Sequence, residues 1–186
     1  MKKILLALAV AAMFSSLAMA ATPIQLSLWN TIAIPKNDTV TGVEIGIGNN
    51  LQSVTGLQWN LVWSKTNNAP LAWQCGILNQ VTGKFSGIQD GFVNWNTGSV
   101  AGLMYGAVNY SEGSNVGVQW GFINFQNSFT GLSLGFLNYA KTVQGVQFGF
   151  LNYADSAKSF AIQIGLLNYL GNSSIYKIFP IINAKI

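Results

Sequence analysis

Few residues of this chain could do chemistry. The 186-residue sequence contains no His and no Arg, and it has nine Lys, five acidic residues and a single Cys, Cys75. Imidazole and carboxylate groups are the usual general acids, general bases and metal ligands, so this composition predicts a non-enzymatic protein with no catalytic residues, no metal site and no cofactor. The net charge is +4 and the sequence has no Arg, so it contains no stripe of basic residues that could bind nucleic acid.

Internal repeats organise the residues after position 20. Each unit reads Gly-x-Gln-x-Gly-x-x-Asn, and we number its places one to eight, with a ninth place for the residue after the Asn. Clear copies begin at Gly42, Gly87, Gly102, Gly117, Gly131, Gly145 and Ala161; weaker copies begin at Gly56 and Leu71; degenerate copies span Pro23–Asn30 and Tyr176–Asn183. A short, fixed spacing of 14 to 16 residues from Gly42 to Ala161 predicts eleven supersecondary units that share one core.

Each unit is predicted to be a β-strand. In the copy at Gly145, the apolar residues Val146, Phe148 and Phe150 alternate with small or polar residues, which is the period of a strand. Short segments rich in Ser, Asn, Thr and Gly separate the units and have the composition of turns. Most charges lie in these segments, so the fold class is all-β with polar turns.

Three sets of polar residues lie inside the predicted strands. Asp90 occupies the fourth place, where other copies have Trp, Phe, Leu, Ile or Tyr, so it is the candidate for a charge in a lumen or a buried pocket, with Lys84 or Lys65 as its partner. Glu44 replaces the usual Gln and is expected to be solvated. The eighth place forms a structural Asn column that includes Asn94, Asn109, Asn124, Asn138, Asn152 and Asn168.

The first twenty residues have the features of a secretory signal peptide. Lys2 and Lys3 precede about 14 apolar or small residues, and Ala18-Met19-Ala20 gives a small-x-small cleavage site. The apolar run is shorter than the roughly 20 residues that a membrane-spanning helix needs. We therefore expect residues 1–20 to be removed and residues 21–186 to form one all-β repeat domain.

Two architectures can use these repeats, and we favour a small antiparallel transmembrane β-barrel with one strand per repeat. A strand such as 143–153 has the length of a tilted outer-membrane strand. The ninth place is aromatic in most copies (Trp95, Tyr110, Phe125, Tyr139, Tyr153 and Tyr169), as expected for interfacial girdles.

The alternative is a parallel β-solenoid with one coil per repeat. Equivalent residues would then stack at about 4.8 Å, and the Asn column would form a ladder of amides. A coil of 14 to 16 residues encloses a thin interior, however, and some of its three or four large apolar side chains would face water unless lipid or a partner covered them.

The combined motifs resemble those of the uncharacterised surface-repeat proteins of diderm bacteria. The units Gly145–Tyr153, Gly87–Asn94, Pro23–Asn30 and Phe179–Asn183 carry this resemblance, which covers nearly all of residues 21–186. It implies an exported protein associated with the cell envelope, and it implies no catalytic residues.

The sequence therefore predicts a non-enzymatic envelope protein at the outer membrane or cell surface, with a structural, pore-like or surface-interaction role. Membrane lipid is the expected partner, and an unidentified partner at the cell surface is a second one. The alternative function is a surface-exposed, periplasmic or secreted solenoid that acts as a binding or adhesion module through a flat Gly-Gln-Gly face.

Overall fold

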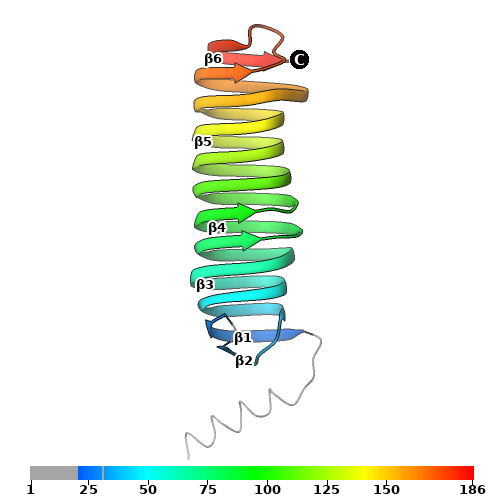
Figure 1. The fold of residues 1–186 in the computed structure, drawn as a ribbon, viewed down its shortest axis with the longest axis vertical. Coiled ribbons are helices and arrows are strands. Elements are labelled where there is room, and N and C mark those ends of the chain that lie inside the picture. The colour runs from blue at the N-terminus through cyan, green and yellow to red at the C-terminus, as the bar shows by residue number, and fades with distance from the viewer. Residues whose placement is uncertain (1–20, 31) are drawn as a thin grey trace, which may run out of the picture.

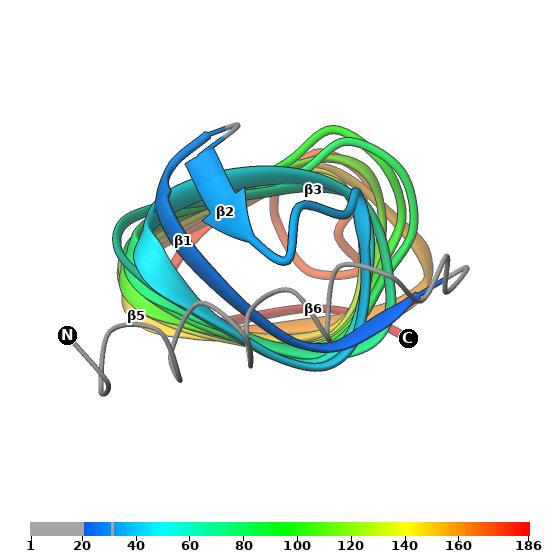
Figure 2. The same ribbon diagram turned by 90° about the horizontal axis from the view of Figure 1, so that it is seen from below.

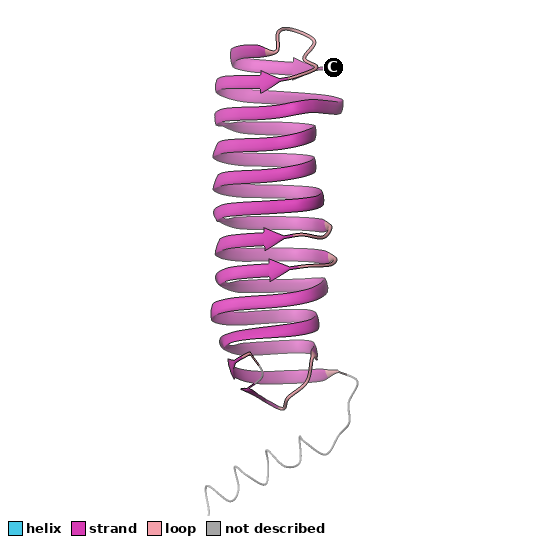
Figure 3. Cartoon of the chain, in the orientation of Figure 1, coloured by secondary structure: helices cyan, strands magenta, loops and turns pink. Residues whose placement is uncertain are grey.

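The chain forms a single-axis β-solenoid. The computed structural model describes residues 21–30 and 32–186, and the predicted signal peptide lies outside these described residues. The strands are β1 (Thr22–Trp29), β2 (Ile32–Ile34), β3 (Thr39–Val81), β4 (Phe85–Asn96), β5 (Val100–Leu170) and β6 (Ile178–Lys185). β3 and β5 are long because the extended chain continues around the corners of successive coils, which stack along one axis in Figures 1 and 3.

Successive coils pair in parallel with a shift of one repeat. Asn79 lies opposite Asn94, and Asn94 lies opposite Asn109, so equivalent places of the repeat are neighbours. The view along the axis shows coil superposed on coil (Figure 2). The favoured antiparallel barrel is therefore wrong, and the all-β solenoid that was the alternative is the observed fold. The described residues contain no helix long and apolar enough to cross a membrane.

Both ends of the rod depart from the regular coil. β1 pairs in parallel with β3, but β2 folds back antiparallel onto β1. At the other end, β6 pairs antiparallel with the last turn of β5, and Asn183 lies opposite Gln163. The eleventh repeat therefore matches the sequence pattern without forming a parallel coil, and it covers much of the open edge that the preceding coil would present.

The interior of the coil is polar. The third-place Gln residues from Gln58 to Gln163 are fully buried, as are the Asn side chains of the eighth place from Asn79 to Asn168 apart from a trace of exposure at Asn152. Small apolar clusters, one around Val81 and Phe85 and one around Phe129 and Val143, fill the remaining space. The alternation of the strand then places the large apolar side chains on the outside, where Trp120 is 57% exposed.

The Asn column is a continuous ladder of hydrogen bonds. From Asn79 to Asn168, each side-chain amide donates to the Oδ1 of the next Asn at 2.8 to 2.9 Å. The same amide nitrogen donates to the main-chain carbonyl of the fourth-place residue in the next coil, as from Asn94 to Tyr105 at 2.8 Å. The ladder thus ties side chains and backbone of adjacent coils together and satisfies groups that would be costly to bury alone.

Glycine is needed at two places because the backbones of adjacent coils approach closely. Gly102, at the first place, has a φ of +146°, and a Cβ there would lie 2.0 Å from the carbonyl oxygen of Gly87. At the fifth place, a Cβ on Gly106 would lie 2.1 Å from the carbonyl oxygen of Gly91 and 2.8 Å from Nδ2 of Asn94. The fifth-place glycines therefore make room for the Asn ladder.

In the weak repeats at Gly56 and Leu71, neighbouring residues take the positions of the missing Gly and Asn. Asn60 stands at a fifth place, and Ser64 takes over the role of the ladder Asn: Asn60 Nδ2 donates to Ser64 Oγ at 3.1 Å, and Ser64 donates to the carbonyl of Cys75 at 3.3 Å. The next repeat begins one residue later than the sequence indicates, since Ala72 and not Leu71 lies opposite Gly87.

A ladder Asn and a nearby turn Asn give a direct test of this interior. Asn124 accepts from Asn109 and donates to Asn138 and to the carbonyl of Leu134, whereas Asn127 is exposed. We expect Asn124→Ala to lower the free energy of unfolding by roughly 2 to 4 kcal/mol, because it leaves buried amide groups unpaired. Asn127→Ala should change it by less than about 0.5 kcal/mol. Urea unfolding followed by circular dichroism measures both, and equal effects would contradict the ladder's structural role.

Candidate ligand-binding groove

Asp90 lies on the outside of the solenoid. Its fourth place alternates with the buried Gln89, so its carboxylate is exposed, and neither a lumen nor a buried pocket surrounds it. The Asp90 carboxylate makes no hydrogen bond or ion pair with the described residues, whereas its main-chain carbonyl accepts from Asn79 Nδ2 at 3.0 Å. Lys65 lies instead over the ring of Trp63, 5.9 Å from its centroid. The predicted burial of Asp90 and its pairing with Lys84 or Lys65 are therefore wrong.

The neighbours of Asp90 come from adjacent coils. Parallel pairing places Cys75 on one side and Tyr105 on the other. Tyr105 packs edge to face against Trp120, with ring centroids 5.4 Å apart. The fourth-place column thus presents a thiol, a carboxylate and two aromatic rings in succession along the rod.

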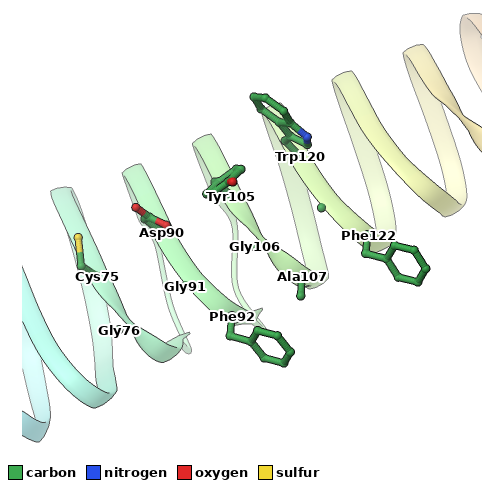
Figure 4. A pocket seen from close by; sticks show the side chains of 11 residues that line it. Cys75, Gly76, Asp90, Gly91, Phe92, Tyr105, Gly106, Ala107, Trp120 and Phe122 are labelled. Carbon is green, nitrogen blue, oxygen red and sulfur yellow. The ribbon is translucent and has the colours of Figure 1, made fainter.

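The sixth-place column lies beside the fourth and has a gap. Phe122, Phe136 and Phe150 stack nearly parallel, with centroids 5.0 and 4.9 Å apart. One coil before Phe122, the sixth place is Ala107, and one coil earlier it is Phe92. Figure 4 shows Phe92 and Phe122 pointing to the same side with the short Ala107 between them.

A depression of about 620 Å³ lies between these two columns. Its floor is the backbone of Gly76, Gly91, Gly106 and Gly121, and its walls are the fourth-place and sixth-place side chains from Cys75 to Phe122. We call this depression the Asp90 groove. It combines apolar aromatic walls with one carboxylate that has no partner among the described residues, which is the usual composition of a small-molecule site.

Cys75 is half-buried and stays protonated at neutral pH. Desolvation by burial raises the pKa of its thiol, and the negative charge of Asp90 raises that pKa further. A thiol in this setting is a weak nucleophile, because the thiolate is the reactive form. The groove therefore has the features of a binding site and not of a thiol-based catalytic centre.

Glu44 is also placed differently from the sequence-based expectation. It is fully buried in the Gln column and is not solvated. Its carboxylate accepts hydrogen bonds from Ser27 Oγ, from Asn60 Nδ2 at 2.7 Å and from Asn49 Nδ2 at 3.3 Å. Ser27 and Asn60 belong to the two neighbouring coils and Asn49 to the same coil, so Glu44 is part of the interior amide network.

The proposed flat Gly-Gln-Gly binding face does not exist on the surface. Gln89, Gln119 and Gln147 are fully buried, and Gln89 donates to Gln74 at 2.8 Å inside the coil. Any partner must therefore contact the apolar columns or the polar turns. No group of three His, Cys, Asp or Glu within residues 21–30 and 32–186 is placed to hold a metal ion.

Two features of the exterior were not anticipated. The gap at Ala107 could have been found by writing the sixth places in order, because Ala interrupts a row of large apolar residues. The ninth-place rings were assigned to two separate girdles, but they form a single stack from Trp95 to Tyr169 with centroid distances between 4.5 and 6.5 Å. Parallel coils bring all of these rings to the same side.

Comparison with protein-family models, with curated proteins and with solved structures finds no match to this chain. The function proposed below is therefore argued from the geometry of the solenoid itself.

Cys75 offers a chemical test of the groove. Because Asp90 raises the pKa of the thiol, Asp90→Asn should lower that pKa, increase the thiolate fraction near pH 8 and speed alkylation of Cys75. Neutral iodoacetamide is the reagent, so that its own charge plays no part. Glu112→Gln removes a carboxylate at the polar turns and serves as the matched control. Equal alkylation rates for Asp90→Asn and the parent protein would show that Asp90 does not act on the thiol.

Proposed function

We propose that this chain is a non-enzymatic, exported protein of the cell envelope that binds a lipid surface through one apolar side of its solenoid. The observation that carries the proposal is a continuous strip of seventh-place and ninth-place side chains. The strip consists of Val93, Val108, Ile123, Leu137, Leu151 and Leu167 together with Trp95, Tyr110, Phe125, Tyr139, Tyr153 and Tyr169. We call it the lipid strip.

The lipid strip lies on the surface, and its side chains carry no charge or amide. All of its side chains are half-buried or exposed, and Leu167 is 48% exposed. A shallow apolar hollow of about 490 Å³ lies between Val93, Trp95, Val108, Tyr110 and Phe125. Contiguous apolar surface of this kind is rare on soluble monomers and is typical of surfaces that bind a membrane or a partner.

Charged residues border the strip on one side only. Glu112, Lys141, Asp155 and Lys158 lie in the polar segments of β5 that follow the ninth place, and all four are exposed. The Tyr110 hydroxyl donates to Glu112 at 3.1 Å, and a hydrogen bond to Asp155 raises the pKa of Tyr153. These rings thus have an apolar body toward the strip and a polar tip toward the charged segments, which is how Tyr residues lie at a membrane surface.

The strip therefore lies between the exposed sixth-place column and the charged segments that follow the ninth place. Lying flat on a membrane, the rod would bury the seventh-place and ninth-place columns and leave the charged segments in water. The resemblance to surface-repeat proteins and the predicted signal peptide support a location at the outer membrane or cell surface. The observed solenoid favours a binding module over a pore, because amide side chains fill its interior.

Two leucines of one coil test the lipid strip. Leu137 lies in the strip, while Leu134 lies at the fourth place on another side of the same coil, and both are half-buried. We expect Leu137→Asp to weaken binding to phosphatidylcholine vesicles by at least about tenfold, because it removes apolar contact and brings a charge to the lipid. Leu134→Asp should change binding by less than about twofold. Vesicle flotation measures both.

The salt dependence adds a second criterion. Because the strip has no charge, binding should persist at high salt and should not require anionic lipid. Circular dichroism checks that both variants keep the β-solenoid. The proposal is wrong if the parent protein does not float with vesicles, or if the two Asp variants weaken flotation equally.

A further inference from the structure

The Asp90 groove has a vacant position in a ladder of aromatic rings. Adjacent coils lie about 4.8 Å apart, so Phe92 and Phe122, two coils apart, stand about 10 Å from each other. Phe122 continues into a stack with Phe136 and Phe150 at 5.0 and 4.9 Å between centroids. The space above Ala107 therefore matches the room that one flat ring needs between Phe92 and Phe122.

A negative charge lies beside this vacant position. Asp90 is two residues before Phe92 on the same strand, about 6.6 Å away along the backbone. Its exposed carboxylate has no cation within the described part of the chain, and its nearest neighbours in the column are Cys75 and the ring of Tyr105. Tyr105 and Trp120 add aromatic rings that attract a cation.

We propose that the Asp90 groove binds a small aromatic ammonium compound, a flat ring joined to an ammonium group by a short chain. The ring stacks between Phe92 and Phe122 above Ala107. The ammonium group crosses the glycine floor and pairs with the Asp90 carboxylate beside Tyr105. The path between the two columns runs over the backbone at Gly91 and Gly106, whose fifth places face the interior of the coil, so no side chain stands between the ring and the carboxylate.

This site is distinct from the lipid strip. The groove uses fourth-place and sixth-place side chains, whereas the strip uses the seventh and ninth places of the same coils. The two sites can therefore be tested separately. Leu137→Asp should leave ligand binding at the groove unchanged.

Calorimetric titration of the purified protein with three indoles of similar size tests the proposal. Tryptamine carries the ammonium group, tryptophol replaces it with a neutral hydroxyl, and indole-3-acetate replaces it with a carboxylate. Tryptamine should bind about five- to tenfold more tightly than tryptophol, since an exposed ion pair and contacts with Tyr105 and Trp120 add to the stacking of the ring. Indole-3-acetate should bind most weakly.

Variants separate the two parts of the site. Asp90→Asn should reduce tryptamine binding to the level of tryptophol, because only the charge is lost. Ala107→Phe should abolish binding of both, because it fills the vacant position as Phe122 and Phe136 fill theirs. Ala101→Phe adds the same ring at an exposed position of β5 outside the groove and is the matched control. Phe122→Ala removes one wall instead, and it should weaken both ligands alike even if Ala107→Phe does not fold.

Cys75 supplies an independent readout, because it lines the same groove. Saturating tryptamine should change its rate of alkylation by iodoacetamide in the parent protein but not in Ala107→Phe, because the bound ligand shields the thiol and its ammonium group offsets the charge of Asp90. Equal binding of tryptamine and tryptophol by the parent protein would overturn the assignment of Asp90. Tight binding by folded Ala107→Phe, or no saturable binding by the parent protein, would overturn the site.

Discussion

The structure depends on hydrogen bonds between identical side-chain amides in successive coils. A primary amide is both a donor and an acceptor, so one Asn can bind the coil before it and the coil after it, as Asn124 does with Asn109 and Asn138. The distance between such amides equals the spacing of paired strands, and the ladder and the backbone therefore reinforce each other. Because the amides are fully buried, each missing bond is costly, and the register of the coils is strongly specified.

A polar interior determines what the exterior must be. The coil is narrow, its walls approach closely at the glycines, and Gln and Asn occupy most of the enclosed volume. Large apolar side chains such as Phe148 and Phe150 then have only the outside to occupy. The hydrophobic effect does not stabilise this surface until something covers it, so the outer columns are suited to association with lipid, ligand or protein.

The sequence predicts the extended chain, the repeat length and the Asn column, because all of these follow from local periodicity. Most of the segments expected to be turns instead continue as extended chain around the corners of the coils in β3 and β5. The sequence does not say which side of each strand is inside, since a period of two only shows which residues share a side. Taking the apolar side as the interior makes the solenoid look too thin and favours a barrel. The same assumption buries Asp90 and solvates Glu44, and the structure reverses both. The three errors thus have one cause.

Departures from the repeat behave differently inside and outside the coil. Inside, neighbours compensate for two of them: Ser64 takes the role of the ladder Asn where Asn60 stands at a glycine place, although Asn79 Oδ1 is left without a donor, and Glu44 meets donors from Ser27 and Asn60. Outside, the departures near the middle of the rod are not compensated, because Asp90 has no cation among the described residues and Ala107 leaves a gap in the ring column. In a fold whose coils are equivalent by translation, chemistry that is particular to one place must come from such a departure. An uncompensated pair on adjacent coils is therefore suited to recognise a specific ligand, while the regular columns offer apolar area without such particular groups.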